Sequence, residues 1–412
     1  KTLTEEVGDK MKVLFLGGVF DDSHNVEIIS KTKTYVEYAA NNFQRKIIEG
    51  LRLCGVSVQV ISAPFIGAYP QAYKDIFFRG FNHKIKDESG YKYAHFNNIW
   101  GIRNPSRRRG VQKLLKDFIN DNDEEKLIIV YTPHTPLIQA ANYAKKKDAK
   151  IKICLVIPDL PQYMNLSSHV PRLYSILKKY DIWTFMKESR TVDSYIILTK
   201  QMAIPLAIGK RPYAVIEGIY EKLDYSLTKN NDGIVRIVYT GRLERNFGIL
   251  NLIKAFSLLE DENLRLVICG GGEAKNEVEA ASVKDRRIEY KGQVSSDIAR
   301  RHILEGDILV NPRQNNSDYT KYSFPSKIID YLSTGNSVVA YKLDGMPEEY
   351  KNFIYFVPDN TIETLAATIK KVIYSTNESR TNKSKAGMKY LENHLSKRNV
   401  AKTILELNNM RI

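Results

Sequence analysis

The chain has few of the residues that build disulfide or metal frameworks, with 3 Cys and 7 His among its 412 residues. Cys54, Cys154 and Cys269 all stand in apolar runs. This setting predicts small buried side chains in a reducing compartment and not a disulfide framework. The histidines and cysteines are too few and too scattered to predict a structural metal site.

Long hydrophobic runs are also missing from the sequence. No stretch approaches the length of about 18 apolar residues that a membrane-spanning helix needs. Residues 1–10 are polar, and Met11 directly precedes an apolar, strand-like run. We therefore expect Met11 to be the natural start, residues 1–10 to be a cloning remnant, and the protein to be cytoplasmic.

Charge of one sign is in excess, since 62 Lys and Arg stand against 47 Asp and Glu, for a net charge of +15. The excess is compatible with nucleic acid, an anionic membrane or phosphorylated small molecules. No zinc-finger spacing, basic heptad region or RNP-like strand is present, which disfavours nucleic acid. A basic N-terminal cluster is either a solvated face or a face towards an anionic membrane; it comprises Arg103, Arg107, Arg108, Arg109, Lys113, Lys116 and 145–147.

The hydrophobic pattern predicts two domains of similar build. Short β-branched runs alternate with longer amphipathic runs, the pattern breaks in the polar segment 222–233, and the alternation then restarts. We expect two Rossmann-like, doubly wound α/β domains, 11–222 and 223–385, facing a central cleft. A helical segment, 386–412, is expected to pack back on the N-terminal domain. Predicted strands are 12–16, 56–62, 126–131, 150–157, 194–198, 236–239, 264–269, 288–290, 308–310, 337–341 and 354–357.

The segment 322–335, Tyr-Ser-Phe-Pro-Ser-Lys-Ile-Ile-Asp-Tyr-Leu-Ser-Thr-Gly, carries the strongest chemical signal. Pro325 fixes a turn and Ser326 is a good N-cap for a helix. The free N–H groups of a helix N-terminus suit a diphosphate, and Lys327 adds a positive charge there. Asp330 either accepts hydrogen bonds from a ribose or simply favours the helix dipole.

Five blocks occur in order around this segment: 239–243, 248–256, 266–272, 306–312 and 323–327. Together they resemble the GT-B retaining glycosyltransferases of glycosyltransferase family 4, and more loosely those of bacterial surface polysaccharides. The resemblance implies a retaining, hexosyl-type transfer from a nucleoside-diphosphate sugar, with a UDP-sugar as first guess, without metal. It also implies a glycan or lipid-linked acceptor in capsular, exopolysaccharide or cell-wall synthesis, at the inner face of the plasma membrane.

The resemblance assigns roles to residues at the matching positions. Catalytic roles fall on His134, Arg242 and Lys327, although His134 could instead cap the next helix and Arg242 could be a surface arginine. Asp159, Glu217 and Arg245 are expected near the cleft, with ordinary turn chemistry as the alternative for Asp159. Donor binding is expected from Gly17, Gly18, Gly241, Gly271, Gly272, Val294, Tyr322, Ser323, Phe324, Pro325, Ser326 and Asp330.

Two positions depart from the family pattern. Tyr322 stands where the family has its first carboxylate, and Phe247 stands where it has a lysine. Lys327, or else Arg245, is expected to supply the missing charge. These departures keep two alternatives open, a nucleotide-sugar epimerase and a non-catalytic nucleotide-sugar-binding partner subunit, and charge alone motivates a third, a nucleic-acid-binding protein.

Overall fold

The computed structural model describes residues 11–34, 36–81, 90–121, 125–163, 172–222, 232–316 and 318–410. The chain divides into two compact units, Lys1–Ile219 with Lys397–Ile412, and Tyr220–Ser396, here called unit 1 and unit 2. Residues 1–10 and most of the predicted linker at 222–233 lie outside the described residues. Each unit is described by itself.

Unit 1 is built on a seven-stranded sheet in the order β4-β2-β1-β6-β7-β8-β9, with every neighbouring pair parallel. Leu14 and Phe15 in β1 are fully buried, as are Ile128 and Ile129 opposite them in the central strand β6. Both faces of the sheet are therefore covered, which explains why its strands are continuous apolar runs. The strands are β1 (Met11–Gly17), β2 (Val58–Ser62), β4 (Lys92–Tyr93), β6 (Glu125–Tyr131), β7 (Ile151–Ile157), β8 (Ser194–Ile197) and β9 (Tyr213–Val215).

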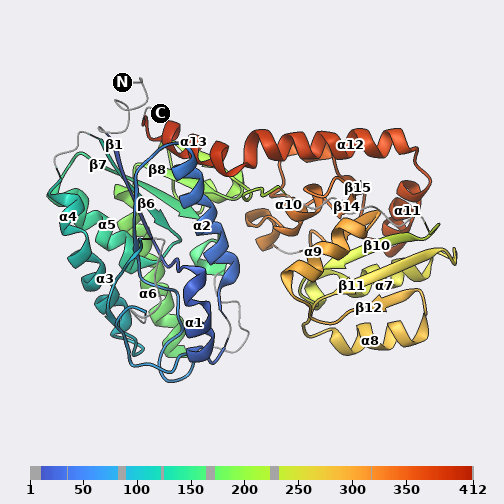
Figure 1. The fold of residues 1–412 in the computed structure, drawn as a ribbon, viewed down its shortest axis with the longest axis horizontal. Helices are drawn as coiled ribbons and strands as arrows, with labels where there is room; N and C mark the ends of the chain where they lie inside the picture. Colours follow the sequence, from blue (N-terminus) through green and yellow to red (C-terminus); the bar gives the residue numbers. More distant parts are fainter. Residues whose placement is uncertain are drawn as a thin grey trace. The chain divides into compact units, whose positions relative to one another are not determined.

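Helices cover both faces of this sheet (Figure 1). On one side α3 packs on α5 and α5 packs on α6, and on the other α13 packs on α2. The helical stretch before β6 begins at Arg103 and breaks at Leu115, which divides it into two helices. The helices are α1 (Asn25–Lys31), α2 (Tyr38–Leu53), α3 (Arg103–Leu114), α4 (Lys116–Ile119), α5 (Thr135–Lys147), α6 (Arg172–Glu188) and α13 (Lys397–Leu407); a short antiparallel pair joins β3 (Phe77–Phe78) to β5 (Phe96–Asn97).

Unit 2 is a second doubly wound unit, with a parallel six-stranded sheet in the order β12-β11-β10-β13-β14-β15. Its core packs Phe256 and Leu252 from α7 against strand residues such as Ile237 and Leu266. Two Rossmann-like units are thereby confirmed. The strands are β10 (Val235–Thr240), β11 (Leu264–Cys269), β12 (Ile288–Tyr290), β13 (Ile308–Asn311), β14 (Ser337–Tyr341) and β15 (Tyr355–Val357); the helices are α7 (Ile249–Ser257), α8 (Lys275–Lys284), α9 (Ser296–Glu305), α10 (Lys327–Leu332), α11 (Ile362–Ile373) and α12 (Asn377–Tyr390).

The C-terminal segment contributes to both units. Helix α12 runs on through residue 385, so the division falls between Ser396 and Lys397 and not at 385/386. Helix α13 then docks on α2 of unit 1, where the Nζ of Lys397 lies 2.8 Å from a carboxylate oxygen of Glu49. A Cβ on Gly50 would lie 2.1 Å from the carbonyl oxygen of Lys397, so this close contact requires glycine.

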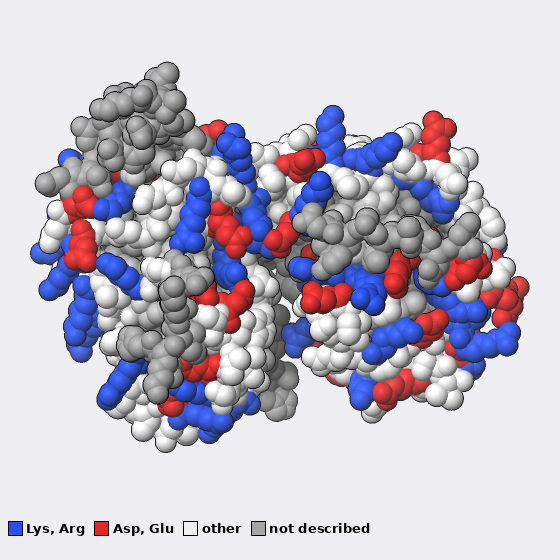
Figure 2. All heavy atoms as spheres, viewed as in Figure 1, with Lys and Arg blue, Asp and Glu red and all other residues white. Residues whose placement is uncertain are grey.

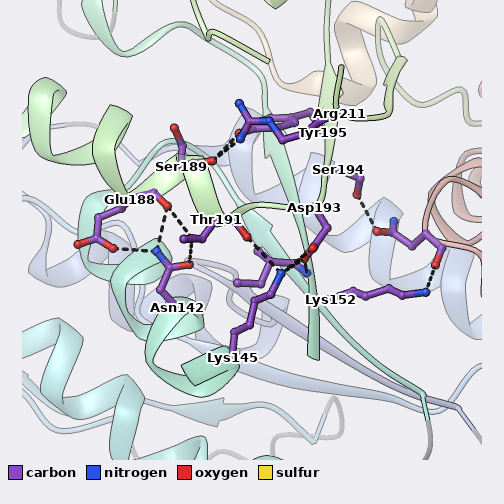
Figure 3. A network of polar contacts seen from close by, with 12 residues as sticks. Asn142, Lys145, Lys152, Glu188, Ser189, Thr191, Asp193, Ser194, Tyr195 and Arg211 are labelled. Atoms are coloured by element: carbon purple, nitrogen blue, oxygen red, sulfur yellow. Dashed lines mark hydrogen bonds and ion pairs between the residues drawn. The ribbon is translucent and has the colours of Figure 1, made fainter. Parts of the chain in front are cut away.

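A polar network fixes the ends of several unit 1 elements to one another (Figure 3). Lys145 of α5 binds both carboxylate oxygens of Asp193 at 2.5 and 2.6 Å, just before β8. Asn142, one turn earlier on α5, donates to the carboxylate of Glu188 at 2.7 Å. Ser194 donates to Asn408 at 2.7 Å. The C-terminal end of α6 is therefore rigidly attached to α5, and the segment after α13 is attached to the sheet.

Candidate functional site

Each sheet has one point at which the strand order reverses. Strands β1 and β6 flank it in unit 1, and strands β10 and β13 flank it in unit 2. The loops that leave the carboxyl ends of two such strands turn to opposite faces of the sheet and open a crevice, where doubly wound folds bind ligands. We refer to these places as the unit 1 crevice and the unit 2 crevice.

Gly17 and Gly18 lie at the unit 1 crevice, where side chains crowd them. A Cβ on Gly17 would lie 2.2 Å from the Oε1 of Gln44, and one on Gly18 would lie 2.5 Å from the ring of Phe65. The Gly18 amide donates to the same Gln44 oxygen at 2.8 Å. A shallow pocket that is open to solvent adjoins this turn; its lining includes Gly18, Phe20, Glu37, Asn41, Gln44, Pro64, Phe65 and Ile66.

His134 lies across the same crevice, at the end of β6. The chain leaves β6 through Thr132, which is buried and has a φ of 72°, a left-handed conformation that is strained for a β-branched residue. The amide of His134 then donates to the carbonyl of Thr132 at 2.7 Å. The imidazole packs near Phe65, with ring centroids 5.6 Å apart. The structure therefore places His134 beside the wall of the pocket.

Arg107 sets the electrostatics of His134. Its guanidinium is 2% exposed, donates to the carbonyl of Pro64 at 2.8 Å and lies over the ring of Phe96 at 4.4 Å. It also lies 3.4 Å from the Nε2 of His134. Burial, with the nearby charges of Arg107 and Arg103, holds the pKa of His134 well below its ordinary value.

His134 is consequently neutral near pH 7, and its tautomer follows from its neighbour. Because a guanidinium only donates hydrogen bonds, this contact favours the tautomer in which Nε2 accepts and Nδ1 carries the proton. This Nδ1 is buried and has no hydrogen-bond partner among the described residues. A donor in that condition suits an oxygen of a bound molecule, because an unpaired buried group is costly.

The other two predicted residues of unit 1 follow strands other than β1 and β6, the two strands that flank its crevice. Asp159 is exposed after β7, one strand further along the sheet, where its charge adds to burial in raising the pKa of Tyr131. Glu217 is 5% exposed and follows β9, at the sheet edge. The structure thus brings together Gly17, Gly18 and His134, while Asp159 borders this group and Glu217 does not.

The glycines of the unit 2 crevice are crowded by backbone. A Cβ on Gly270 would lie 1.8 Å from the carbonyl oxygen of Gly241, and one on Gly272 would lie 2.8 Å from the backbone of Leu243. The amide of Leu243 donates to the carbonyl of Gly271 at 2.9 Å, and the amide of Gly270 donates to Gly292, two residues before Val294. The loops after β10, β11 and β12 therefore form one continuous backbone surface.

The side chains of the two arginines after β10, Arg242 and Arg245, differ in how firmly neighbouring residues hold them. The side chain of Arg242 is 79% exposed, with the Glu244 carboxylate 3.5 Å from its Nε. Its own carbonyl accepts from the hydroxyl of Tyr239 at 2.7 Å, which fixes the backbone but leaves the guanidinium free to move. Arg245 is instead held by the carboxylate of Glu277. Arg242 is therefore the better placed of the two to meet a phosphate.

The segment 322–335 is built differently from the sequence prediction. Helix α10 has only six residues, and Ser326 has helical backbone angles and makes no side-chain cap, so the predicted N-cap is wrong. The Nζ of Lys327 lies 3.2 Å from the Oδ2 of Asp330, and both side chains are about half exposed. Phe324 is buried against Tyr350. Pro325 is also buried, whereas Tyr322 and Ser323 are partly exposed.

Arg313 is a residue of this crevice that the sequence analysis did not predict. It follows β13, the strand beside β10, and its guanidinium stacks over the ring of Phe247 at 5.2 Å and over Tyr319 at 4.8 Å. It donates to the hydroxyl of Ser323 at 3.1 Å. The position of Arg313, a basic residue just after a predicted strand, could have indicated a role at the crevice. Its orientation, however, depends on the rings of Phe247 and Tyr319, which come from two other segments.

The predicted basic face of unit 1 is smaller than the sequence suggests. Arg107 is wrong as a member, because it is buried, and Lys145 is paired with Asp193. Arg108 donates to Gln139 of α5 at 3.3 Å. Figure 2 shows Lys and Arg interspersed with Asp and Glu on the face in view. Some of the basic side chains of this cluster are therefore buried or paired within unit 1 and are not part of an exposed basic face.

The described residues contain no group of three or more His, Cys, Asp or Glu that could hold a metal ion. None of their helices is long and apolar enough to cross a membrane.

Two doubly wound units, each with one reversal of strand order, are the architecture of the GT-B fold, which the similar solved structures described below share. Residues 235–375 match the family model described as glycosyl transferases group 1. No curated protein sequence matches the chain. The matched region lies within unit 2 and supports glycosyl transfer as the activity.

Solved structures similar to this chain have low sequence identity but extend over its whole length. Anabaena HepE in complex with UDP is 14% identical, with 97% of this chain and 100% of that chain covered and a TM-score of 0.61. Sucrose-phosphate synthase from Thermosynechococcus elongatus is 14% identical, with 97% and 98% covered and a TM-score of 0.62. The trehalose-6-phosphate protein from E. coli bound with UDP-2-fluoro glucose is 10% identical, with 97% and 99% covered and a TM-score of 0.60.

Proposed function

We propose that this protein transfers a hexose from a nucleoside-diphosphate sugar, a UDP-sugar in the first instance, to a glycan or lipid-linked acceptor with retention of configuration. The observation that carries the proposal is the unit 2 crevice within the matched region 235–375, where Arg242 and Arg313 flank a glycine-lined backbone surface. UDP in the similar Anabaena structure and UDP-2-fluoro glucose in the E. coli structure favour uridine as the base.

The proposed chemistry uses fixed positive charge and no metal. When the sugar leaves, negative charge develops on the diphosphate, and arginine donors stabilise it through charge-assisted hydrogen bonds. Preorganised donors of this kind contribute about 3 kcal/mol or more each to lowering a barrier. In unit 1 the Nδ1–H of His134 is the proposed donor to an oxygen of the sugar or acceptor.

The proposed setting is bacterial surface-polysaccharide synthesis at the inner face of the plasma membrane. It follows from the resemblance of the sequence blocks together with the net charge of +15. A lipid-linked acceptor requires the enzyme at a membrane surface, and cationic groups favour binding to anionic leaflets.

Ligand-induced stabilisation tests the donor. UDP, GDP, ADP and CDP are added separately to the full chain, and the melting temperature is measured; a ligand at 100 times its Kd stabilises by about 2.7 kcal/mol. We expect UDP to raise the melting temperature most. If no nucleoside diphosphate changes it, the proposed donor class is wrong.

Turnover of the matching sugar nucleotide separates the proposal from its alternatives. An epimerase converts the donor when no acceptor is present. A transferase without an acceptor only hydrolyses the donor slowly, and it turns over fully once an acceptor is added. A non-catalytic subunit binds the donor with neither reaction, and Asp330→Ala or His134→Ala would leave its role intact. Proton NMR of the product's anomeric centre reports whether configuration is retained.

A further inference from the structure

Helix α6 carries a large apolar stripe that faces solvent. Ile176, Tyr180 and Trp183 are spaced four and three residues apart, and they are 64%, 65% and 58% exposed. This spacing places them on one side of the helix. Phe185, on the opposite side, is 1% exposed and anchors the helix in the core. The stripe is therefore a separate outward face and not part of the packing of unit 1.

The acidic residues of α6 lie towards α5 and away from the stripe. The carboxylate of Glu188 accepts from Asn142 of α5 at 2.7 Å (Figure 3). The backbone carbonyl of Asp181 accepts a hydrogen bond from the hydroxyl of Thr135, at the start of α5, at 3.5 Å. At about 100° per residue, both carboxylates project more than a quarter-turn from the line through Ile176 and Trp183. Neither carboxylate therefore lies on the stripe itself.

Cations and aromatic rings share the stripe. The Nζ of Lys187 lies 5.4 Å from the centre of the Trp183 ring, one turn along the same line. The rings of Tyr180 and Trp183 stack at 5.9 Å. Lys179 is also exposed. Apolar side chains bordered by Tyr, Trp and Lys have the composition of helices that lie in the interface of a bilayer.

We propose that α6 is an interfacial helix that docks unit 1 on an anionic lipid bilayer, with Ile176, Tyr180 and Trp183 among the acyl chains and Lys179 and Lys187 at the phosphates. From Ile176 to Lys187 the stripe is about 16 Å long, so the helix lies along the surface. A single exposed helical stripe is narrow for a stable protein interface, which buries about 800 Å² on each partner, and lysine is depleted from such interfaces. Charge complementarity therefore selects the lipid surface. This inference does not depend on the transferase activity.

Vesicle co-sedimentation tests the proposal on the full chain. Wild-type protein is expected to sediment with vesicles of three parts phosphatidylcholine to one part phosphatidylglycerol, and not with pure phosphatidylcholine. The triple variant Ile176→Ser, Tyr180→Ser, Trp183→Ser is expected to bind at least tenfold more weakly. The matched control is Ile204→Ser, which removes an isoleucine that is 87% exposed on the same unit and should bind like wild type.

Fluorescence localises the contact. The chain has two tryptophans, so a Trp100→Phe background leaves Trp183 as the single reporter. Anionic vesicles should shift its emission to shorter wavelength, and Lys179→Glu with Lys187→Glu should abolish the shift. Failure of the wild type to bind either vesicle overturns the proposal, as does a triple variant that binds like wild type. A change of the triple variant from dimer to monomer, without lipid binding by the wild type, would instead identify an interface between copies.

Discussion

The two crevices hold positive charge in opposite ways. In unit 1, Arg107 is fully buried, binds backbone carbonyls and His134, and has no acidic partner among the described residues. In unit 2, Arg242 is largely exposed beside Glu244, and Lys327 shares its charge with Asp330. A buried cation that contacts carbonyls is fixed in place, whereas exposed side chains can rearrange around a ligand.

This difference suits two kinds of ligand. The unit 1 crevice presents a neutral imidazole with one oriented N–H, which suits the hydroxyl groups of a sugar. The unit 2 crevice presents mobile and stacked guanidinium groups over a backbone surface, which suits a charged diphosphate. The predictions below test whether the crevices differ as these contacts indicate, starting with the largest expected effect.

Gly270→Ala should damage unit 2 most. Its Cβ would lie 1.8 Å from a backbone oxygen, and its φ of 150° is rarely adopted by other residues, so the loops after β10 and β11 must move apart. We expect a loss of about 3 kcal/mol, or roughly 6–12 °C in the melting temperature of a unit this size. Calorimetry measures the shift. Gly271→Ala is the control, because its Cβ would meet only the tip of Gln293; equal shifts for both variants would show that backbone crowding is not the cause.

Arg313→Met should weaken UDP binding by about 10- to 100-fold, or about 1.4–2.8 kcal/mol, because it removes a stacked charge and the bond to Ser323. Isothermal titration calorimetry measures the affinity. Arg313→Lys keeps the charge without the planar group and should give an intermediate value. Arg286→Met removes an exposed arginine paired with Glu262 and should bind UDP like wild type. Unchanged affinity in Arg313→Met would remove this residue from the donor site.

Most of the fold could be predicted from the sequence, and α6 shows why part of it could not. Strands β11, β12 and β14 match their predicted bounds, because buried parallel strands are continuous apolar runs. Helix α6 was missed, since Ile176 and Trp183 face solvent and do not mark a core-facing side. The spacing of apolar residues in a sequence does not show whether they pack against the protein core or face outwards.

The sequence could predict which strand ends form the candidate site, but it could not predict which side chains contact one another there. His134 and Gly18 follow strands that a doubly wound topology brings together, so their proximity was expected. In contrast, Arg107 stands in a run of arginines, and the sequence does not show which member turns inwards. The role of Arg313 depends on Phe247 and Tyr319, which come from separate loops.

His134 should make the protein less stable in mild acid. Burial holds its folded-state pKa below the unfolded value of about 6.5, so below that pH the unfolded chain binds a proton that the folded chain does not. Stability therefore falls as the pH drops below about 6.5, by up to about 1.4 kcal/mol per pH unit.

Thermal unfolding between pH 7 and 5 measures this dependence, and His134→Asn should reduce it. His302, whose pKa is also lowered by burial, remains in both proteins. A slope in His134→Asn equal to that of wild type would mean that the imidazole is charged in the folded protein.

The smallest effect on stability is expected from the Lys327–Asp330 pair. A half-exposed ion pair three residues apart on a helix contributes about 0.5 kcal/mol or less to stability. The free energy of unfolding of Lys327→Met and of Asp330→Asn should therefore each differ from that of wild type by no more than about 0.5 kcal/mol. Any loss of UDP affinity in these variants, expected at about three- to tenfold, then reports contact with the ligand and not damage to the fold. A loss of more than 1 kcal/mol in stability would make the pair structural.

Arg107→Met should instead lower stability and leave UDP binding unchanged. The charge of Arg107 is part of the buried packing of unit 1, and its removal leaves the carbonyl of Pro64 and the Nε2 of His134 without their hydrogen-bond donor.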